Sequence, residues 1–121
     1  MHADMYSIDF CRSRNLVDIR WAGLFRSEAV NGYAEELEHR FLAAGFRTGY
    51  RLRMDMSAAT AQPLVAVSRI HERLRGFPKA SRIAVVAASS ITHLQVRHYM
   101  KQDYLRLFDA PAPALDWLMA A

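Results

Sequence analysis

The chain has little of several features that mark particular classes of protein. It contains one cysteine, Cys11, so no internal disulfide can form and a reducing cytoplasm is the simplest location. No apolar run reaches the roughly 18 residues that a membrane-spanning helix needs. The N-terminus lacks a basic segment followed by an apolar one, so we expect no signal peptide. These absences predict a cytoplasmic protein without a membrane span.

Glycine is scarce, and the common catalytic motifs are missing. Five glycines and the lack of a glycine-rich phosphate loop disfavour a nucleotide cradle. No zinc-protease, Cys-x-x-Cys or Gly-x-Ser-x-Gly motif occurs, and the histidines do not cluster with metal-ligand spacing. No acid/base constellation can be named. We therefore predict a protein that is not an enzyme, with no cofactor and no metal site.

The positive charge of the chain is dispersed. The net charge is +4, but the arginines are scattered and form no dense basic block, so we expect no specific nucleic-acid binding. With 121 residues, of which 52% are hydrophobic, the chain has the size and balance of one globular domain. We predict a single domain over residues 1–121.

Five segments have the patterns of β-strands. The run from Ile83 to Ala88 is apolar without alternation, which predicts a strand buried on both faces. Apolar and polar residues alternate in four other segments, which predicts strands with one wet face. These four segments are 6–10, 16–21, 50–55 and 104–108.

Helical patterns separate these strands. An apolar stripe at spacings of three and four, begun by Ser27 and ended by Gly45, predicts the first helix. A small-residue loop over 56–62 precedes a second helix from Pro63 to Leu74. The third follows the cap residues Ser89 and Ser90, and a short final helix follows a predicted cap at Asp109–Pro111. The order is ββαβαβαβα.

This order predicts an α/β fold: an N-terminal β-hairpin, then a βα superhelix with a mostly parallel five-stranded sheet. Right-handed crossovers between neighbouring strands place helices mainly on one face. The charged alternate positions of the strands then lie on the other face, which we expect to be largely open to water or to a partner. The candidate interaction surface on that face comprises Arg20, Arg51, Arg53 and Arg106.

A second candidate site lies at the carboxyl ends of the strands, where open parallel sheets bind ligands. There the sequence places Asp55, Ser57 and Thr60 beside Ser89, Ser90 and Thr92. Helix N-termini and hydroxyls suit a phosphate or a carboxylate. The alternative is structural, because serine and threonine at helix starts are ordinarily caps and Asp55 can brace its loop.

The element order and several segments resemble the SpoIIAA-like superfamily, which contains the STAS domains and the CRAL-TRIO lipid-binding domains. The segments are Val17–Gly23, Leu52–Asp55, Arg82–Val86, Leu107–Asp109 and Ala114–Leu118. They are most similar to bacterial STAS/SEC14-like single-domain proteins. The resemblance implies a β/α superhelix with helices on one side and a regulatory role.

The chain departs from this superfamily at one motif. Anti-sigma-factor antagonists of the STAS type carry an Asp-Ser-Ser-Gly phosphoacceptor motif at the helix after strand three. The matching stretch here, Asp55–Pro63, reads Asp-Met-Ser-Ala-Ala-Thr-Ala-Gln-Pro, so the motif is absent. Ser57 and Thr60 lie in this stretch but outside a phosphoacceptor motif. The resemblance therefore does not imply that either residue is phosphorylated.

Two functions remain in view. The first is a non-enzymatic regulatory or interaction domain that binds a protein partner, a second copy of itself or a small anionic ligand. The second is a lipid or apolar small-molecule module of the CRAL-TRIO/SEC14 type, which needs a cavity of roughly a few hundred Å³ that 121 residues leave little room to build. Aromatic side chains either fill the core or line such a cavity: Trp21, Phe25, Tyr33, Phe41, Phe46 and Trp117.

Overall fold

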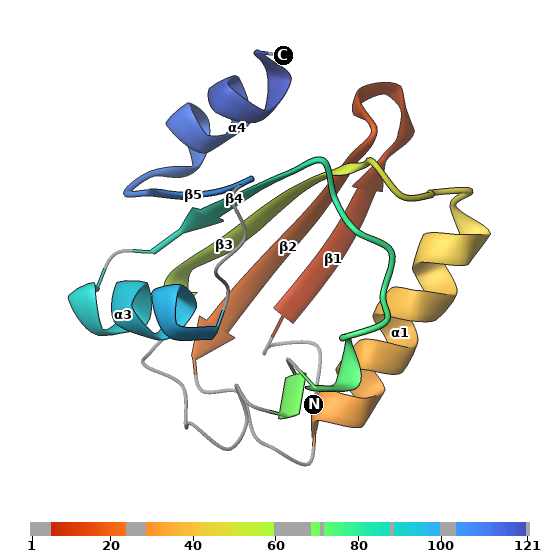
Figure 1. Cartoon of the computed structure of the whole chain (residues 1–121), viewed down its shortest axis with the longest axis horizontal. Coiled ribbons are helices and arrows are strands. Elements are labelled where there is room, and N and C mark those ends of the chain that lie inside the picture. Colours follow the sequence, from red (N-terminus) through yellow and green to blue (C-terminus); the bar gives the residue numbers. More distant parts are fainter. Residues whose placement is uncertain are drawn as a thin grey trace.

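The computed structural model describes residues 6–23, 29–59, 69–70, 72–87, 89–99 and 104–120 (Figure 1). Its strands are β1 (Tyr6–Cys11), β2 (Leu16–Gly23), β3 (Arg51–Ala59), β4 (Arg82–Val86) and β5 (Leu105–Phe108). Its helices are the 3-10 turn η2 (Arg12–Arg14), α1 (Val30–Ala43), α3 (Ser90–Tyr99) and α4 (Pro111–Met119). Within this part of the chain, no helix is both long enough and apolar enough to span a membrane.

The five strands form one sheet in the order β1-β2-β3-β4-β5. β1 runs antiparallel to β2, and the other neighbours are parallel. Asn15 closes the hairpin in the left-handed conformation, with φ 51°, which asparagine adopts more readily than most residues. The predicted hairpin and the predicted sequential parallel sheet are therefore confirmed.

β3 is longer than the sequence predicted. The loop expected over 56–62 is wrong for residues 56–59, which continue the strand to Ala59; residues 60–62 lie outside the described part. After a register shift between Arg20 and Ala22, Ala22 pairs with Ala58. Small residues carry no strand pattern of their own, so only the pairing with β2 defines this end of the strand.

One face of the sheet packs against α1 and α3. Its side chains include Ile19 of β2, Leu52 of β3 and Ile83 of β4, which share a core with Tyr33 of α1 and Val96 of α3. This is the face on which right-handed crossovers place their helices. We call it the α1 face.

The opposite face is half covered by α4. Ala84 and Val86 of β4 pack against Ala114 and Leu118 of α4, and all four are fully buried. The expectation that this face would lie largely open is therefore wrong over β4 and its neighbours. The physical reason is that α4 follows the last strand and is not a crossover helix, so the handedness rule does not assign its face.

Arginines of the sheet hold α4 by its backbone carbonyls. Arg51 Nε donates to the Leu118 carbonyl over 2.9 Å, and an Arg82 terminal nitrogen donates to the Trp117 carbonyl over 2.6 Å. The last carbonyls of a helix have no regular partners within it. Arg51 supplies a donor to the Leu118 carbonyl, and Arg82 adds one to the Trp117 carbonyl, which also accepts the Ala120 N–H over 3.3 Å. The N-cap of α4 is Ala110, without a side-chain bond, so the predicted cap at Asp109 is wrong.

Candidate functional site

The part of this second face that lies over β1, β2 and the end of β3 carries polar side chains. Strand alternation and register place Ser7 opposite Arg20 and Asp9 opposite Asp18. Ser7, Asp9 and Arg20 are exposed. We name this surface the polar strip and define it as Ser7, Asp9, Asp18, Arg20, Asp55 and Ser57.

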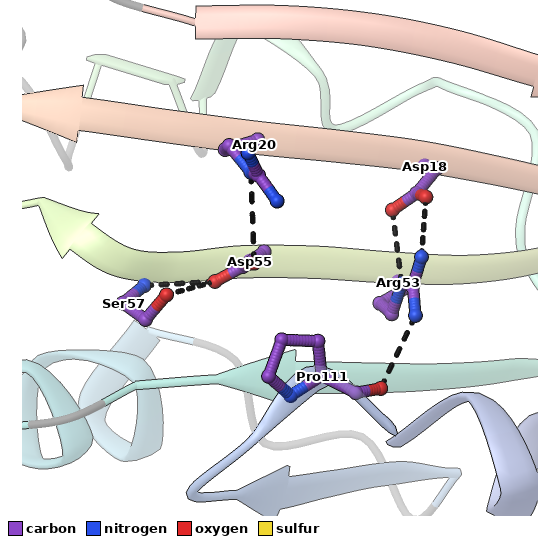
Figure 2. Close-up of polar contacts among 6 residues, drawn as sticks. All are labelled: Asp18, Arg20, Arg53, Asp55, Ser57 and Pro111. Carbon is purple, nitrogen blue, oxygen red and sulfur yellow. Dashed lines mark hydrogen bonds and ion pairs between the residues drawn. The ribbon is translucent and has the colours of Figure 1, made fainter. Parts of the chain in front are cut away.

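Arg53 of β3 ties the strip to α4. Its Nε and a terminal nitrogen donate to the two Asp18 carboxylate oxygens over 3.0 and 2.6 Å (Figure 2). Its other terminal nitrogen donates to the Pro111 carbonyl over 3.1 Å. The hydrogen bonds that Arg53 donates to the Asp18 carboxylate raise the pKa of the Arg53 guanidinium. Such a bidentate pair fixes both side chains in one geometry.

Asp55 is a buried carboxylate, only 4% exposed. One of its oxygens, Oδ1, accepts the backbone N–H of Ser57 over 2.9 Å and the Ser57 hydroxyl over 2.6 Å. Its Oδ2 lies 3.7 Å from Arg20 Nε, and the Arg20 side chain remains 66% exposed (Figure 2). These contacts satisfy the carboxylate, as a buried charge requires.

The strand-end residues predicted from the sequence are partly brought together. Asp55 binds Ser57, which supports the bracing interpretation of Asp55. Asp55 pairs in register with Val86, three residues before the exposed Ser89, so Ser57 and Ser89 share one edge of the sheet. Thr60 lies outside the described residues. Ser90 and Thr92 belong to α3, but their side chains also lie outside the description.

The four predicted interface arginines share one face, as expected, but differ in availability. Arg51 and Arg53 are bound to α4 carbonyls, with Arg51 also donating to the Arg14 carbonyl. Arg106 is exposed, with its guanidinium 5.8 Å from the centre of the Trp117 ring. Arg20 is the member of the set that belongs to the polar strip, and its side chain is 66% exposed. Sequence patterns alone could not reveal the role of α4, because hydrogen bonds to backbone carbonyls leave no residue signature.

A cavity of about 370 Å³ lies on the α1 face. Its walls come from β2, β3, β4, α1, α3 and the segment that precedes β4. The expectation that 121 residues leave little room for such a cavity is therefore wrong. The residues that line it include Trp21, Tyr33, Leu37, Met54, Met56, Arg75, Lys79, Ile83 and Val96.

The aromatic residues proposed from the sequence divide between cavity and core. Trp21 and Tyr33 line the cavity, whereas Phe41 and Phe46 are buried in the surrounding core. Trp117 lies on the opposite face, and Phe25 lies outside the described residues. Burial raises the pKa of the Tyr33 and Tyr50 phenols above their usual range, consistent with apolar surroundings.

A free thiol and clusters of metal-ligating side chains are two other features that can carry chemistry. Cys11 is a free thiol whose sulfur lies 3.4 Å from the Ser13 hydroxyl, and this hydrogen bond lowers its pKa. Among the described residues, no three histidine, cysteine, aspartate or glutamate side chains gather into a group that can hold a metal ion.

Comparison with known proteins relates the chain to several solved structures. No protein-family model and no curated protein matches the sequence. An uncharacterised protein of the DUF3478 family with a SpoIIAA-like fold, from Shewanella loihica PV-4, superposes with a TM-score of 0.70. It is 19% identical, with 93% of each chain covered. An anti-sigma factor antagonist from Mycobacterium paratuberculosis gives a TM-score of 0.65 at 13% identity, with 96% of each chain covered.

These likenesses extend over nearly the whole chain and concern its fold. The described elements and the two superpositions give this chain a SpoIIAA-like α/β fold, which confirms the fold that the sequence resemblance implied. Neither of these two structures is described as a CRAL-TRIO domain, so the comparisons lend that relationship no support.

Proposed function

We propose that this chain is a non-enzymatic regulatory domain that binds a partner protein through the polar strip. The same fold occurs in an anti-sigma factor antagonist, over almost all of both chains. In the part of the chain that the structure describes, the buried carboxylate of the strip, Asp55, accepts a hydrogen bond from Ser57 and pairs with Arg20. These contacts do not present it to a substrate as a general acid or base. Binding, not catalysis, fits such a surface.

The observation that carries this proposal is the state of Arg20. Its side chain is 66% exposed, yet Asp55 anchors one side of the guanidinium at 3.7 Å. An anchored arginine loses less conformational freedom when it binds, and arginine is enriched at protein interfaces. Because Arg53 already neutralises Asp18, the strip offers Arg20 as its accessible cation for an acidic group of the partner.

A partner protein is favoured over the small anion considered from the sequence. The Asp55 carboxylate lies at the strand end that such an anion would occupy, and it uses the proton of the Ser57 hydroxyl. A second negative charge beside that carboxylate is repelled unless a cation intervenes. A partner surface can contact the solvent-exposed side of Arg20 and leave the buried Asp55 undisturbed.

The proposal is tested with a photo-crosslinking amino acid at Ser7, the exposed residue opposite Arg20 on β1. We expect one adduct of defined mass in cells that make the protein naturally, retained with Arg20→Lys and lost with Arg20→Glu. A crosslinker at Thr48, an exposed position before β3, is the matched control and should give no such adduct.

Two outcomes would count against partner binding by the polar strip. One is the same set of adducts from Ser7 and Thr48. The other is an adduct at Ser7 that survives Arg20→Glu unchanged. Thermal unfolding of each variant checks that the exposed substitutions leave the fold intact.

A further inference from the structure

The cavity on the α1 face has walls suited to an apolar molecule. Met54 and Met56 of β3 line it together with Trp21 and Tyr33. Methionine side chains are flexible and polarizable, so they adapt to irregular apolar shapes, while the aromatic rings give large rigid surfaces. Its volume of about 370 Å³ falls at the lower end of the roughly 300–1,000 Å³ typical of ligand sites. This size suits one small ligand and not a two-chain lipid.

The charged residues of the lining are basic. Among the residues that the structure describes, Arg75 and Lys79 are the charged lining residues, both are exposed, and none of the described lining residues carries a carboxylate. Arg75 is paired with Glu72, which is not a lining residue. Lys79 makes no ion pair with any acidic residue that the structure describes. A lysine in the wall of an apolar cavity complements a ligand with an anionic end.

We propose that this cavity binds a small aliphatic monocarboxylate, with its chain among Met54, Met56 and Val96 and its carboxylate at Lys79. This inference goes beyond the proposed partner binding, which uses the opposite face of the sheet. The ligand class follows from the combination of one apolar chamber and one unengaged cation. A neutral apolar molecule would use the apolar chamber but not the cation. A small inorganic anion would use the cation but not the chamber.

Calorimetric titration of the full-length protein with decanoate and with decanol tests both parts of the inference. The two probes share a chain and differ in the charge of the head group. We expect decanoate to bind at least about tenfold more tightly than decanol, which corresponds to about 1.4 kcal/mol. Lys79→Glu should abolish that preference and leave decanol affinity unchanged. Arg47→Glu, at an exposed position outside the lining, should alter neither titration.

A cavity-filling variant tests the location. Met54→Trp should reduce decanoate affinity more than tenfold, and Arg20→Glu should leave it unchanged because Arg20 lies on the other face. The absence of decanoate binding at millimolar concentration would overturn the proposal. Equal binding of both probes, unaffected by Lys79→Glu, would overturn the assignment of an anionic ligand. Binding to phosphatidylglycerol vesicles without binding of free decanoate would show a membrane lipid instead and overturn the monocarboxylate.

Discussion

The two faces of the sheet are packed in different ways. Under α4, the small side chains of Ala84 and Val86 meet Ala114 and Leu118, and nothing of these four residues is exposed. On the α1 face, longer side chains surround a cavity of about 370 Å³. β4 contributes to the cores on both faces, because its successive side chains point alternately to one face and the other.

The difference in packing indicates which side of the sheet is rigid and which side can adjust to a bound molecule. Small residues allow α4 to approach the sheet closely, and sheet arginines satisfy its last carbonyls, so the α4 contact leaves no space to fill. The α1 face lacks neighbours for part of its apolar surface, and such surface forfeits dispersion contacts until a ligand supplies them. We therefore place structural stability on the α4 side and ligand binding on the α1 side.

The largest expected effect comes from removing a side chain on the close-packed side. Leu118→Ala should lower the free energy of unfolding by about 3 kcal/mol. The substitution removes the hydrophobic transfer free energy of a fully buried side chain and leaves a void in its place. Denaturant unfolding measures the change. Leu37→Ala is the matched substitution at the cavity, because Leu37 is a buried leucine that lines it, and it should cost less than half as much since part of its surface already faces empty space. Equal losses would break the comparison between the faces.

The next effect concerns Arg53, which connects the polar strip to α4. Arg53→Met should cost about 2 kcal/mol, because it leaves the Asp18 carboxylate and the Pro111 carbonyl without this donor. Arg75→Met removes the exposed pair with Glu72 and should cost under about 0.5 kcal/mol. A similar loss of unfolding free energy in both variants would contradict the special role of Arg53.

A smaller effect is expected at the end of α4. Arg82 donates to the Trp117 carbonyl, and its guanidinium lies 4.8 Å from the centre of the Trp117 ring. Arg82→Met should reduce stability by about 1 kcal/mol and speed hydrogen exchange mainly in α4. Faster exchange spread evenly over α1 and α4 would show that Arg82 does not act on α4 in particular.

The smallest effect appears only at alkaline pH and concerns the outer side of the α1 face. Burial and a 2.6 Å hydrogen bond to Glu36 raise the pKa of Tyr6 to about 12. Because this value lies above the usual 10, Tyr6 contributes stability below pH 10 that is lost as the pH rises through 12. Tyr6→Phe should flatten the decline of unfolding free energy between these pH values. An unchanged slope would mean that Tyr6 titrates normally.

Most of the fold could be predicted from the sequence because strand alternation and helical spacing are strong local signals. The apolar run of β4 even indicated burial on both faces. That observation conflicted with the expectation of an open second face, and the structure resolves the conflict with α4, which covers β4 and leaves the polar strip uncovered. A helix after the last strand has no crossover rule to place it, so its side could not be predicted.

The sites were less predictable than the fold. The sequence predicts Asp55 and Ser57 as site residues, and their contact follows from a separation of two residues. The Asp18–Arg53 pair needed the β2–β3 register, which no local pattern supplies. The cavity depends on how α1, α3 and the segment before β4 sit above the sheet, and Lys79 acquires its position only through that packing.

Crystallography of the protein under xenon pressure tests the contrast between the two faces most directly, because xenon enters apolar cavities without needing a specific ligand. We expect xenon on the α1 face, beside Met54 and Ile83, and none between β4 and α4. Xenon beneath α4, or none on the α1 face, would contradict this contrast.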